Sequence, residues 1–471
     1  MTNEKVTDQL SELEIRQQKL DQYRSDNIEP FEYSYKRSHH ISEIIEQHAK
    51  LEGGEKTEHS VCVSGRIMAK RGHGKVVFIN VKDESGTIQL YISVNELGDA
   101  FKQVEMLDVG DIIGAEGLVF CTRRGELSIN VKTCKLLTKS LHPLPEKYHG
   151  LQDKEARYRQ RYVDLIANPD VMDVFKKRSS IIKHIRNFLN NDDFMEVETP
   201  VLHHIYGGAS ARPFTTYHNE LKQDLYLRIA LELHLKRLVV GGFEKIYEIG
   251  RVFRNEGVSF KHNPEYTLLE LYQAYADYTD MMSLTETLMN HLVKTTYGTE
   301  VIEYQGEQLE FKLPFKRLPM RDAILEHSKL DINIASEADM ITLLKTKGID
   351  CPDGSPKGEL INEVYDAFVE DKLIQPTFIV DYPLETSPLA KKHRDNPTYV
   401  ERFELIINKM EIANAFTELN DPIDQEDRLK AQEEARDMGF EEAQKMDKDF
   451  VEALFKFILS NICLILYSTS L

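Results

Sequence analysis

The chain has 471 residues, 41% of them apolar and 29% charged, which is typical of globular proteins and excludes disorder over the whole chain. At roughly 150 residues per domain, this length predicts about two to four domains. Lys and Arg number 59 against 78 Asp and Glu, so the formal net charge is −19. A protein that coats nucleic acid over its whole surface needs the opposite sign, so any nucleic acid must bind a local patch.

Cysteine use and the hydropathy pattern predict a cytoplasmic protein. The five cysteines are dispersed without a CxxC pair, which argues against both a disulfide framework and a zinc site. The N-terminal residues are polar and acidic, without the apolar core of a secretory signal. No uninterrupted apolar run has the length that a membrane span requires.

The N-terminal third is predicted to hold a helical segment and a small β domain. Residues 1–55 are expected to be helical and exposed, because their apolar residues are too sparse for a buried stripe. Residues 56–145 contain roughly five short β-rich runs separated by glycine-containing turns, which indicates a small closed barrel. The OB-fold is the leading candidate, because it commonly binds single-stranded nucleic acid. Residues 61–141 carry 11 basic and 9 acidic side chains, so this stretch does not repel phosphate on average.

The remaining chain is predicted to form one larger α+β domain. Residues 146–165 follow two prolines, are densely charged and are expected to be a hinge. Residues 166–454 mix helices and strands without the regular alternation of a doubly wound sheet, which favours an antiparallel sheet. Within them, residues 171–192 have a helical apolar period and residues 194–202 alternate like a strand. Residues 455–471 form an atypical apolar tail.

The most distinctive local feature is the run GRVFRNEGVSFKHNPEYTLLELYQAYAD at 250–277. In an extended chain Arg254 and Glu256 share one face, and Glu270 and Tyr272 share a face of the returning strand. Arginine offers a planar fork of donors to phosphate or carboxylate, and a neighbouring glutamate can accept from an exocyclic amine. The run therefore predicts two strands, a polar loop and an anion-binding arginine. Taken alone, the Arg254–Glu256 pair fits a surface ion pair better.

A second constellation is YVERFELIINKMEIANAFTELNDP at 399–422, which predicts a β-hairpin. Asn414 and Glu418 fall on one face of its second strand, because their spacing is even. Glu404 and Glu411 lie on opposite arms and can meet across the hairpin. Paired carboxylates near phosphate suit Mg²⁺, which completes its shell with water and substrate. As two among 78 acidic residues, the same glutamates also fit a solvated face.

Together with FMEVETPVL, GGASARPFTTYHN and LYLRIALELHLKRLVVGGFEKIYEIG, these runs resemble class II lysyl-tRNA synthetases of the bacterial type. FRNEG with HNPE resembles the family's motif 2, and the strand that ends at Pro200 resembles motif 1, the dimer-interface element. The resemblance implies an N-terminal OB-fold that binds the anticodon and a class II α+β catalytic domain with an antiparallel sheet. It implies a lysine–tRNA ligase, which activates L-lysine with ATP to lysyl-adenylate and transfers it to the 3′-hydroxyl of the matching tRNA. A Mg²⁺-dependent homodimer without a membrane partner is expected.

The resemblance also implies roles for individual residues of the catalytic domain. Arg254, the expected catalytic residue, would hold the ATP α-phosphate and the amino-acid carboxylate. The other ATP-binding residues would be Asn255, Glu256, His262, Asn263 and Tyr266, the last of which stacks on adenine. The lysine-binding residues would be Gly208, Glu232, Glu270, Tyr272, Asn414 and Glu418. Glu404 and Glu411 would bind Mg²⁺.

Within the lysine pocket, Gly208 and Glu232 would receive the α-amino group and Glu418 would pair with the ε-ammonium. A desolvated carboxylate rejects any amino acid that leaves it unpaired, so Glu418 would supply much of the discrimination. In the barrel, Phe78 would stack on the central uridine of the anticodon and Gln89 would hydrogen-bond to it, with Arg66 and Glu126 as neighbouring contacts. An aromatic platform with one amide is a common way to bind an unpaired base.

The chain departs from the family after residue 454. The family continues there into motif 3, a glycine-rich strand and helix with an arginine that would sandwich adenine, whereas this sequence runs FKFILSNICLILYSTSL. We therefore expect slower adenylate formation, and an unpaired sheet edge that favours association although the apolar tail can partly fill the groove. A smaller departure is Leu231, where a proline commonly precedes the glutamate that corresponds to Glu232.

Other functions are compatible with parts of this pattern. The missing motif 3 favours a synthetase-like protein that binds tRNA without aminoacylating it. Activation of aspartate or asparagine is the alternative within the enzyme class, and the carboxylate of Glu418 argues against an acidic substrate. A ligase that lysylates a protein is disfavoured, because such relatives lack the barrel. Taken singly, Phe78 and Tyr272 also fit ordinary packing of a strand against a core.

Overall fold

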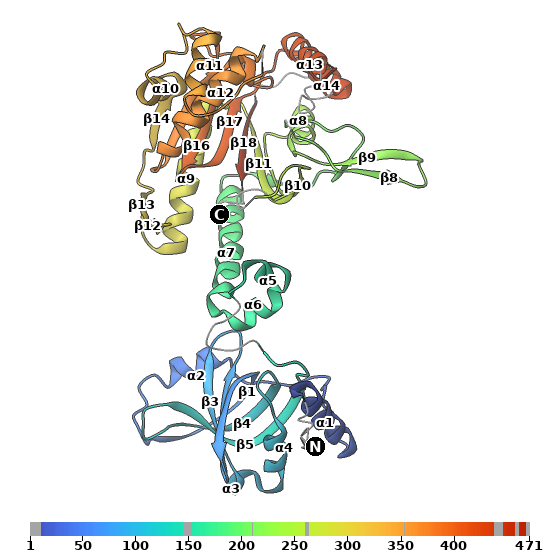
Figure 1. The fold of residues 1–471 in the computed structure, drawn as a ribbon, viewed down its shortest axis with the longest axis vertical. Coiled ribbons are helices and arrows are strands. Elements are labelled where there is room, and N and C mark those ends of the chain that lie inside the picture. Colours follow the sequence, from blue (N-terminus) through green and yellow to red (C-terminus); the bar gives the residue numbers. More distant parts are fainter. Residues whose placement is uncertain are drawn as a thin grey trace, which may run out of the picture. The chain divides into compact units, whose positions relative to one another are not determined.

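The computed structural model describes residues 11–144, 152–209, 211–259, 263–352, 354–437, 446–456 and 461–467. The chain divides into two compact units, Met1–Asp173 and Val174–Leu471, whose elements are labelled in Figure 1. Among the described residues, none of the helices combines the length and the hydropathy that crossing a bilayer requires.

The first unit is built around five strands and several short helices. Its elements are α1 (Glu12–Ser25), α2 (Ile41–Gln47), β1 (Lys56–His73), β2 (Val76–Lys82), β3 (Thr87–Ser93), α3 (Val94–Leu97), α4 (Phe101–Met106), β4 (Ile112–Cys121), β5 (Leu127–Thr138), α5 (Lys154–Arg159) and α6 (Arg161–Ala167). Helix α1 starts with a capping box at Ser11, which satisfies N–H groups that a helix end leaves open. Leu13 and Ile15 on this helix are exposed, but Leu20 and Tyr23 are buried, so the expectation of an exposed N-terminal segment without a buried stripe is wrong.

The five strands close into a barrel in the order β1-β2-β3-β5-β4, which confirms the barrel predicted from the sequence. Alternation along β2 explains the closure, because Val77, Ile79 and Val81 are buried while the residues between them are half-exposed. The inward side chains form the core of this unit together with Ile41 and Ile44 of α2.

The segment expected to be a hinge, 146–165, falls partly on residues 145–151, which lie outside the described residues. Its later part is helical and forms α5 and most of α6. Asp164 is buried and accepts hydrogen bonds from the side chains of Arg157 and Arg161. The charge-assisted bond from Arg157 links α5 to α6, whereas that from Arg161 lies within α6.

The second unit is an α+β domain. Helix α7 (Pro169–Asn191) spans the boundary between the units. The other elements are β6 (Met195–Glu196), β7 (Leu202–His203), β8 (Thr215–His218), β9 (Gln223–Leu227), α8 (Glu232–Val240), β10 (Lys245–Phe253), β11 (Glu265–Ala274), α9 (Tyr278–Tyr297), β12 (Val301–Tyr304), β13 (Glu307–Glu310), β14 (Lys316–Pro319), α10 (Met320–Ser328), α11 (Glu337–Lys345), α12 (Lys357–Phe368), β15 (Thr377–Pro383), β16 (Tyr399–Ile407), β17 (Met410–Thr417), α13 (Pro422–Asp437), α14 (Lys448–Lys456) and β18 (Asn461–Tyr467).

An eight-stranded sheet of order β14-β15-β16-β17-β18-β11-β10-β6 organises this unit. Its central strands are antiparallel, as predicted, and only the outer pairs β14–β15 and β10–β6 are parallel. The hairpin predicted for 399–422 is β16–β17. Its two-residue turn, Asn408–Lys409, has positive φ at both residues, as a hairpin turn that follows the strand twist requires. The strand expected over 194–202 is much shorter, since β6 contains only two residues.

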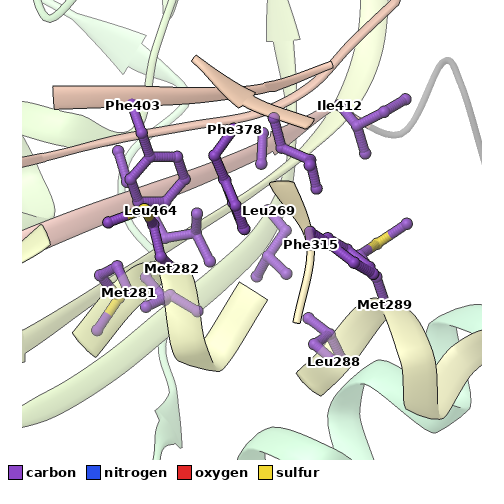
Figure 2. Close-up of a cluster of buried hydrophobic side chains, with 14 of the residues drawn as sticks. Leu269, Met281, Met282, Leu288, Met289, Phe315, Phe378, Phe403, Ile412 and Leu464 are labelled. Atoms are coloured by element: carbon purple, nitrogen blue, oxygen red, sulfur yellow. The ribbon is translucent and has the colours of Figure 1, made fainter. Parts of the chain in front are cut away.

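Strand β18 corrects one expectation from the sequence. It pairs with β17 on one side and β11 on the other, so these two strands do not form the unpaired edge that was expected. Apolar packing accounts for this strand at Leu464 and Ile465, which contact two different apolar clusters. Leu464 is fully buried in the cluster with Phe403 and Met282, as Figure 2 shows.

Helix α9 supplies much of the core beneath the sheet. Its buried face presents Met281, Met282, Leu288 and Met289, which Figure 2 shows near the sheet residues Phe378 and Phe403. The helix starts at a capping box at Asp277 and ends at Gly298, whose φ of 72° suits a glycine. This face of the sheet is therefore filled with apolar side chains, and the opposite face is available for polar ones.

Candidate active site

The opposite face of the sheet carries a row of polar side chains in register. Glu270 on β11 is paired with Ile465 on β18, which is paired with Asn414 on β17, which is paired with Glu404 on β16. Directly paired residues in a sheet project to the same face. The structure thus brings together residues of two segments that the sequence separates by more than a hundred positions. Neighbouring strands lie ~5 Å apart, so β18 holds β11 and β17 roughly 10 Å apart.

The β10–β11 connection places Arg254 at the edge of this face. Its backbone N–H donates to the carbonyl of Pro264 at 2.8 Å, and that of Asn255 donates to the carbonyl of Arg212 at 2.8 Å. These bonds fix the base of the loop. The Arg254 guanidinium carbon lies 5.6 Å from the centroid of the Tyr266 ring, which is within cation–π range. Burial raises the pKa of Tyr266 to about 12, so its hydroxyl stays neutral.

The other residues assigned to ATP lie on the same loop. Asn255, Glu256 and Asn263 are exposed, and the Asn263 side chain donates to the carbonyl of Glu265 at 2.9 Å. His262 lies outside the described residues. An exposed loop beside a half-buried arginine and the half-buried Tyr266 of β11 can bind a nucleotide phosphate and base.

Three buried carboxylates form the centre of the site. Glu232 is the first residue of α8, Glu270 lies on β11 and Glu418 directly follows β17, and all three residues are at most 5% exposed. Burial raises the pKa of Glu270 to about 8, and the neighbouring charge of Glu232 adds to this effect. Burial likewise raises the pKa of Glu418, although the nearby Lys236 opposes the shift.

Each of these carboxylates has a different hydrogen-bond environment. Glu270 Oε1 accepts from the backbone N–H of Leu231 at 2.9 Å, and Glu418 Oε2 pairs with Lys236 Nζ at 2.7 Å. Within the described part of the chain, no protein group hydrogen-bonds to Glu270 Oε2 or Glu418 Oε1. Buried oxygens without partners are costly, so the pocket is suited to ligands with hydrogen-bond donors.

Gly208 lies against Glu232. Its φ is +85°, and a Cβ at this position would lie 3.0 Å from Glu232 Cβ and 3.3 Å from Ala230 Cβ. Both the backbone conformation and the lack of space therefore require glycine here. Tyr272, the other residue of β11 predicted to bind lysine, is fully buried two positions from Glu270 on the same face.

The two glutamates proposed as metal ligands do meet across the hairpin. The Asn414 amide nitrogen donates to Glu404 Oε1 at 3.3 Å and to Glu411 Oε1 at 3.2 Å. Arg402 also donates to Glu404 Oε1 at 2.6 Å. Burial and the charge of Glu404 raise the pKa of Glu411 to about 8. Two carboxylates held this close are a suitable oxygen donor set for Mg²⁺, whose remaining ligands are water and substrate. Among the residues described, no group of three or more His, Cys, Asp or Glu could hold a metal.

The barrel has a separate polar and aromatic face. Phe78 on β2 points outward, since the flanking Val77 and Ile79 are buried. Its ring lies 5.5 Å from that of Tyr91, which lies 5.9 Å from that of Phe120. A core-packing role for Phe78 therefore does not fit, whereas three adjacent half-exposed rings are suited to stacking with bases.

The other three barrel residues predicted to contact the anticodon lie in different environments. Gln89 is half-exposed, and its side-chain oxygen accepts from the Ser128 hydroxyl at 3.1 Å. Glu126 is exposed in the turn between β4 and β5. Arg66 donates to the carbonyl of Gly110 at 2.7 Å, so part of its guanidinium is already engaged within the barrel.

Sequence reasoning missed two residues of the site. Lys236 is buried between Glu232 and Glu418, but in the sequence a glutamate and a lysine four residues apart on a helix resemble an ordinary surface pair. Arg402, which contacts both Glu404 and Asn414, lies two positions from Glu404 on β16. Even spacing along a strand is the signal that could have indicated it.

Comparison with known proteins agrees with both units. The family described as tRNA synthetases class II (D, K and N) matches residues 153–458, and the OB-fold nucleic acid binding domain matches residues 61–137. A lysine–tRNA ligase of Fervidobacterium nodosum is 51% identical over 441 residues, covering 94% of this chain and 86% of that protein. A lysine–tRNA ligase of Carboxydothermus hydrogenoformans is 52% identical, with 95% and 91% covered. One of Staphylococcus epidermidis is 49% identical, with 96% and 92% covered.

Proposed function

This chain belongs to the class II tRNA synthetases of the D, K and N group, and on that premise we propose that it is a lysine–tRNA ligase. It would activate L-lysine with ATP and transfer the lysyl group to the 3′-terminal hydroxyl of the matching tRNA. The observation that supports this function best is the pocket of Glu232, Glu270 and Glu418, in which two buried carboxylate oxygens are left without a hydrogen-bond partner from the described residues.

Lysine is the substrate whose charges complement this pocket. Glu232, beside Gly208, would receive the α-ammonium together with Glu270, and Glu418 would pair with the ε-ammonium. Tyr272 and Asn414 would line the path of the aliphatic chain. Aspartate or asparagine would leave Glu418 unpaired, and aspartate would add a further negative charge among three carboxylates.

The first chemical step would be an in-line substitution at phosphorus. A carboxylate oxygen of lysine forms a bond to the ATP α-phosphorus while the bond to the bridging oxygen of the β-phosphate breaks, which releases pyrophosphate. Arg254 would contact the α-phosphate and the lysine carboxylate and offset the negative charge that the transition state spreads over the phosphoryl oxygens. Tyr266, next to Arg254, would stack on adenine, with Asn255, Glu256, His262 and Asn263 as neighbouring contacts. No protein nucleophile is required, so catalysis would rest on positioning and electrostatics.

Glu404 and Glu411 would hold Mg²⁺, because their carboxylates face one another at Asn414 and supply hard oxygen ligands. When bound, the ion supplies charge neutralisation on the ATP phosphates. Arg402 would keep Glu404 in place through its 2.6 Å contact.

The second step would transfer the lysyl group to tRNA. The ribose 3′-hydroxyl attacks the carbonyl carbon of lysyl-adenylate, loses its proton and displaces AMP. The barrel would select the tRNA, with Phe78 stacking on the central anticodon base, Gln89 hydrogen-bonding to its edge, and Arg66 and Glu126 contacting its neighbours. Since the chain carries a net charge of −19, this recognition must rely on the local barrel face.

We also propose a cytoplasmic homodimer that assembles through the motif 1 region. Supporting residues are the exposed apolar side chains of the second unit at the start of α7 and beside β6 and β7: Val174, Phe175, Met195, Val201 and Leu202. Apolar residues exposed together commonly mark an interface.

Amino-acid-dependent exchange of pyrophosphate into ATP tests the proposal. Exchange stimulated by L-lysine, and by neither aspartate nor asparagine, is the expected result. Exchange with aspartate or asparagine would contradict the assignment of the pocket. Tight binding of tRNA without exchange for any amino acid would instead favour a tRNA-binding protein.

A further inference from the structure

Helix α8 buries charged residues along its inner face. Glu232, Leu235, Lys236 and Val239 are the buried members, at the i, i+3, i+4 and i+7 spacing of a helical stripe. Lys236 Nζ lies 2.5 Å from Glu232 Oε1 and 2.7 Å from Glu418 Oε2, and its side chain is only 5% exposed. A lysine is rarely buried this deeply unless it is paired.

The surroundings of Lys236 fix its ammonium group at this point. The rings of Phe416 on β17 and Phe450 on α14 lie 5.5 and 5.7 Å from Nζ. Helix α14 packs against α8, as Figure 1 also shows. Asp449 on α14 and Asp447 just before it pair with Arg237 rather than with Lys236. The Lys236 ammonium is thus surrounded by the rings of Phe416 and Phe450 and by the carboxylates of Glu232 and Glu418.

We propose that Lys236 is the positioning residue of the lysine pocket, an internal ammonium that holds one oxygen of Glu232 and one of Glu418 so that the other oxygen of each faces the substrate. The inference rests on the proposed function, because it takes these two carboxylates as the receivers of the α- and ε-ammonium groups. Glu418 Oε1, the oxygen that Lys236 does not hold, is buried without a partner among the described residues. Glu232 Oε2 points toward Gly208, lying 3.6 Å from where a Cβ on that glycine would be.

The charges of the pocket explain why such a lysine is needed. Glu232, Glu270 and Glu418 together present three negative charges when ionised, whereas lysine brings two ammonium groups, and its carboxylate is matched by Arg254. Lys236 compensates the third charge. Without it, one carboxylate would remain buried and uncompensated in the complex, and it would take up a proton instead.

A purely structural role for Lys236 makes a different prediction. If the residue only fastened α8 to the sheet, its replacement would weaken the binding of lysine and of ATP together and would leave the pH dependence of lysine binding unchanged. If Lys236 instead positions the two carboxylates and stabilises their ionised forms, its replacement would weaken the binding of lysine but not of ATP. It would also shift the pH dependence of lysine binding, because both carboxylates would then retain protons to higher pH.

The experiment compares K236M and K236R in the full chain, with K139M as a matched control. Lys139 is equally buried between two carboxylates, 2.6 Å from Asp108 Oδ2 and 2.9 Å from Asp111 Oδ2, but it lies in the barrel unit. Titration calorimetry gives the Kd of L-lysine and of ATP from pH 6 to pH 9, and a thermal melt checks that each variant is folded.

The expected result is that K236M raises the Kd of lysine at pH 7 by about tenfold or more while that of ATP is unchanged. The pH at which lysine affinity reaches half its maximum should move upward in K236M and return toward the wild-type value in K236R, which keeps the charge. K139M should change neither quantity. A wild-type Kd and pH midpoint in K236M, or equal losses for lysine and ATP, would overturn the inference and leave the proposed function intact. Absence of lysine binding by the wild-type chain would overturn both.

Discussion

The affinity for lysine should rise with pH, because Glu270 has to lose a proton when lysine binds. In the pocket without substrate, burial and the charge of Glu232 raise the pKa of Glu270 to about 8, so the group is mostly protonated at pH 7. In the complex, the α-ammonium of lysine would lie beside Glu270 and lower this pKa, so the bound form is ionised. Binding therefore releases a proton below pH 8, and affinity increases with pH up to about 8 and then levels off.

The size of this effect follows from the pKa. A carboxyl group with a pKa near 8 is ~1% ionised at pH 6 and about half ionised at pH 8, so its contribution changes lysine affinity ~50-fold over this interval. Free lysine keeps both ammonium groups almost fully charged over the same interval. Glu418, whose pKa is also raised, would add to the change in the same direction.

Titration calorimetry of Glu270→Gln against the wild type isolates this contribution. The variant should bind lysine like the wild type at pH 6, where Glu270 is neutral. Between pH 6 and pH 8 its lysine affinity should lack the ~50-fold rise that Glu270 contributes in the wild type. Repeating the titrations in buffers of different ionisation enthalpy counts the released protons. Asp381→Asn is a matched control, because burial also raises the pKa of Asp381 but the residue is not part of the pocket. A wild-type affinity independent of pH, or a full pH dependence in Glu270→Gln, would refute the reasoning.

Three further substitutions separate the parts of the site. Glu418→Gln should weaken lysine binding by about 2–5 kcal/mol and leave ATP binding unchanged in the same titrations, since a buried ammonium loses its counter-charge; equal losses would show that Glu418 is structural. Phe78→Ala should weaken tRNA binding by about 1–3 kcal/mol in a filter-binding assay while pyrophosphate exchange persists, and loss of exchange would mean that Phe78 holds the fold. Gly208→Ala should lower the melting temperature and the lysine affinity, because φ is +85° and the added Cβ would lie 3.0 Å from Glu232 Cβ; wild-type values for both would show that the loop adapts.

Much of the fold was predictable because strand alternation is a strong local signal. The barrel strands, the β16–β17 hairpin and the shared face of Glu270 and Tyr272 all follow from a period of two. Phe78 was a candidate base platform only because of the family resemblance, and the burial of its neighbours in β2 is what distinguishes that role from core packing. Residues on one face of a strand can be read from sequence, whereas the order of the strands in the sheet cannot.

The contacts that sequence reasoning missed depend on packing between distant segments. Lys236 is buried because α14 and β17 bring Phe450 and Phe416 over it, and nothing in the local sequence of α8 distinguishes it from an exposed lysine. The hydrogen bond from Leu231 to the Glu270 carboxylate is donated by a backbone N–H, so the identity of residue 231 could not predict it. The apolar character of the tail indicated that it could partly fill the groove, but not that β18 would pair with both β17 and β11.

The central claim is that the chain attaches lysine to tRNA, and a charging assay tests it most directly. Total tRNA is incubated with ATP, Mg²⁺, the full chain and one radiolabelled amino acid at a time, and acid-precipitable label is counted. We expect label from lysine alone, and we expect it to be lost when Glu418 is replaced by Gln. Label from aspartate or asparagine, or no label from lysine on tRNA that the chain demonstrably binds, would contradict it.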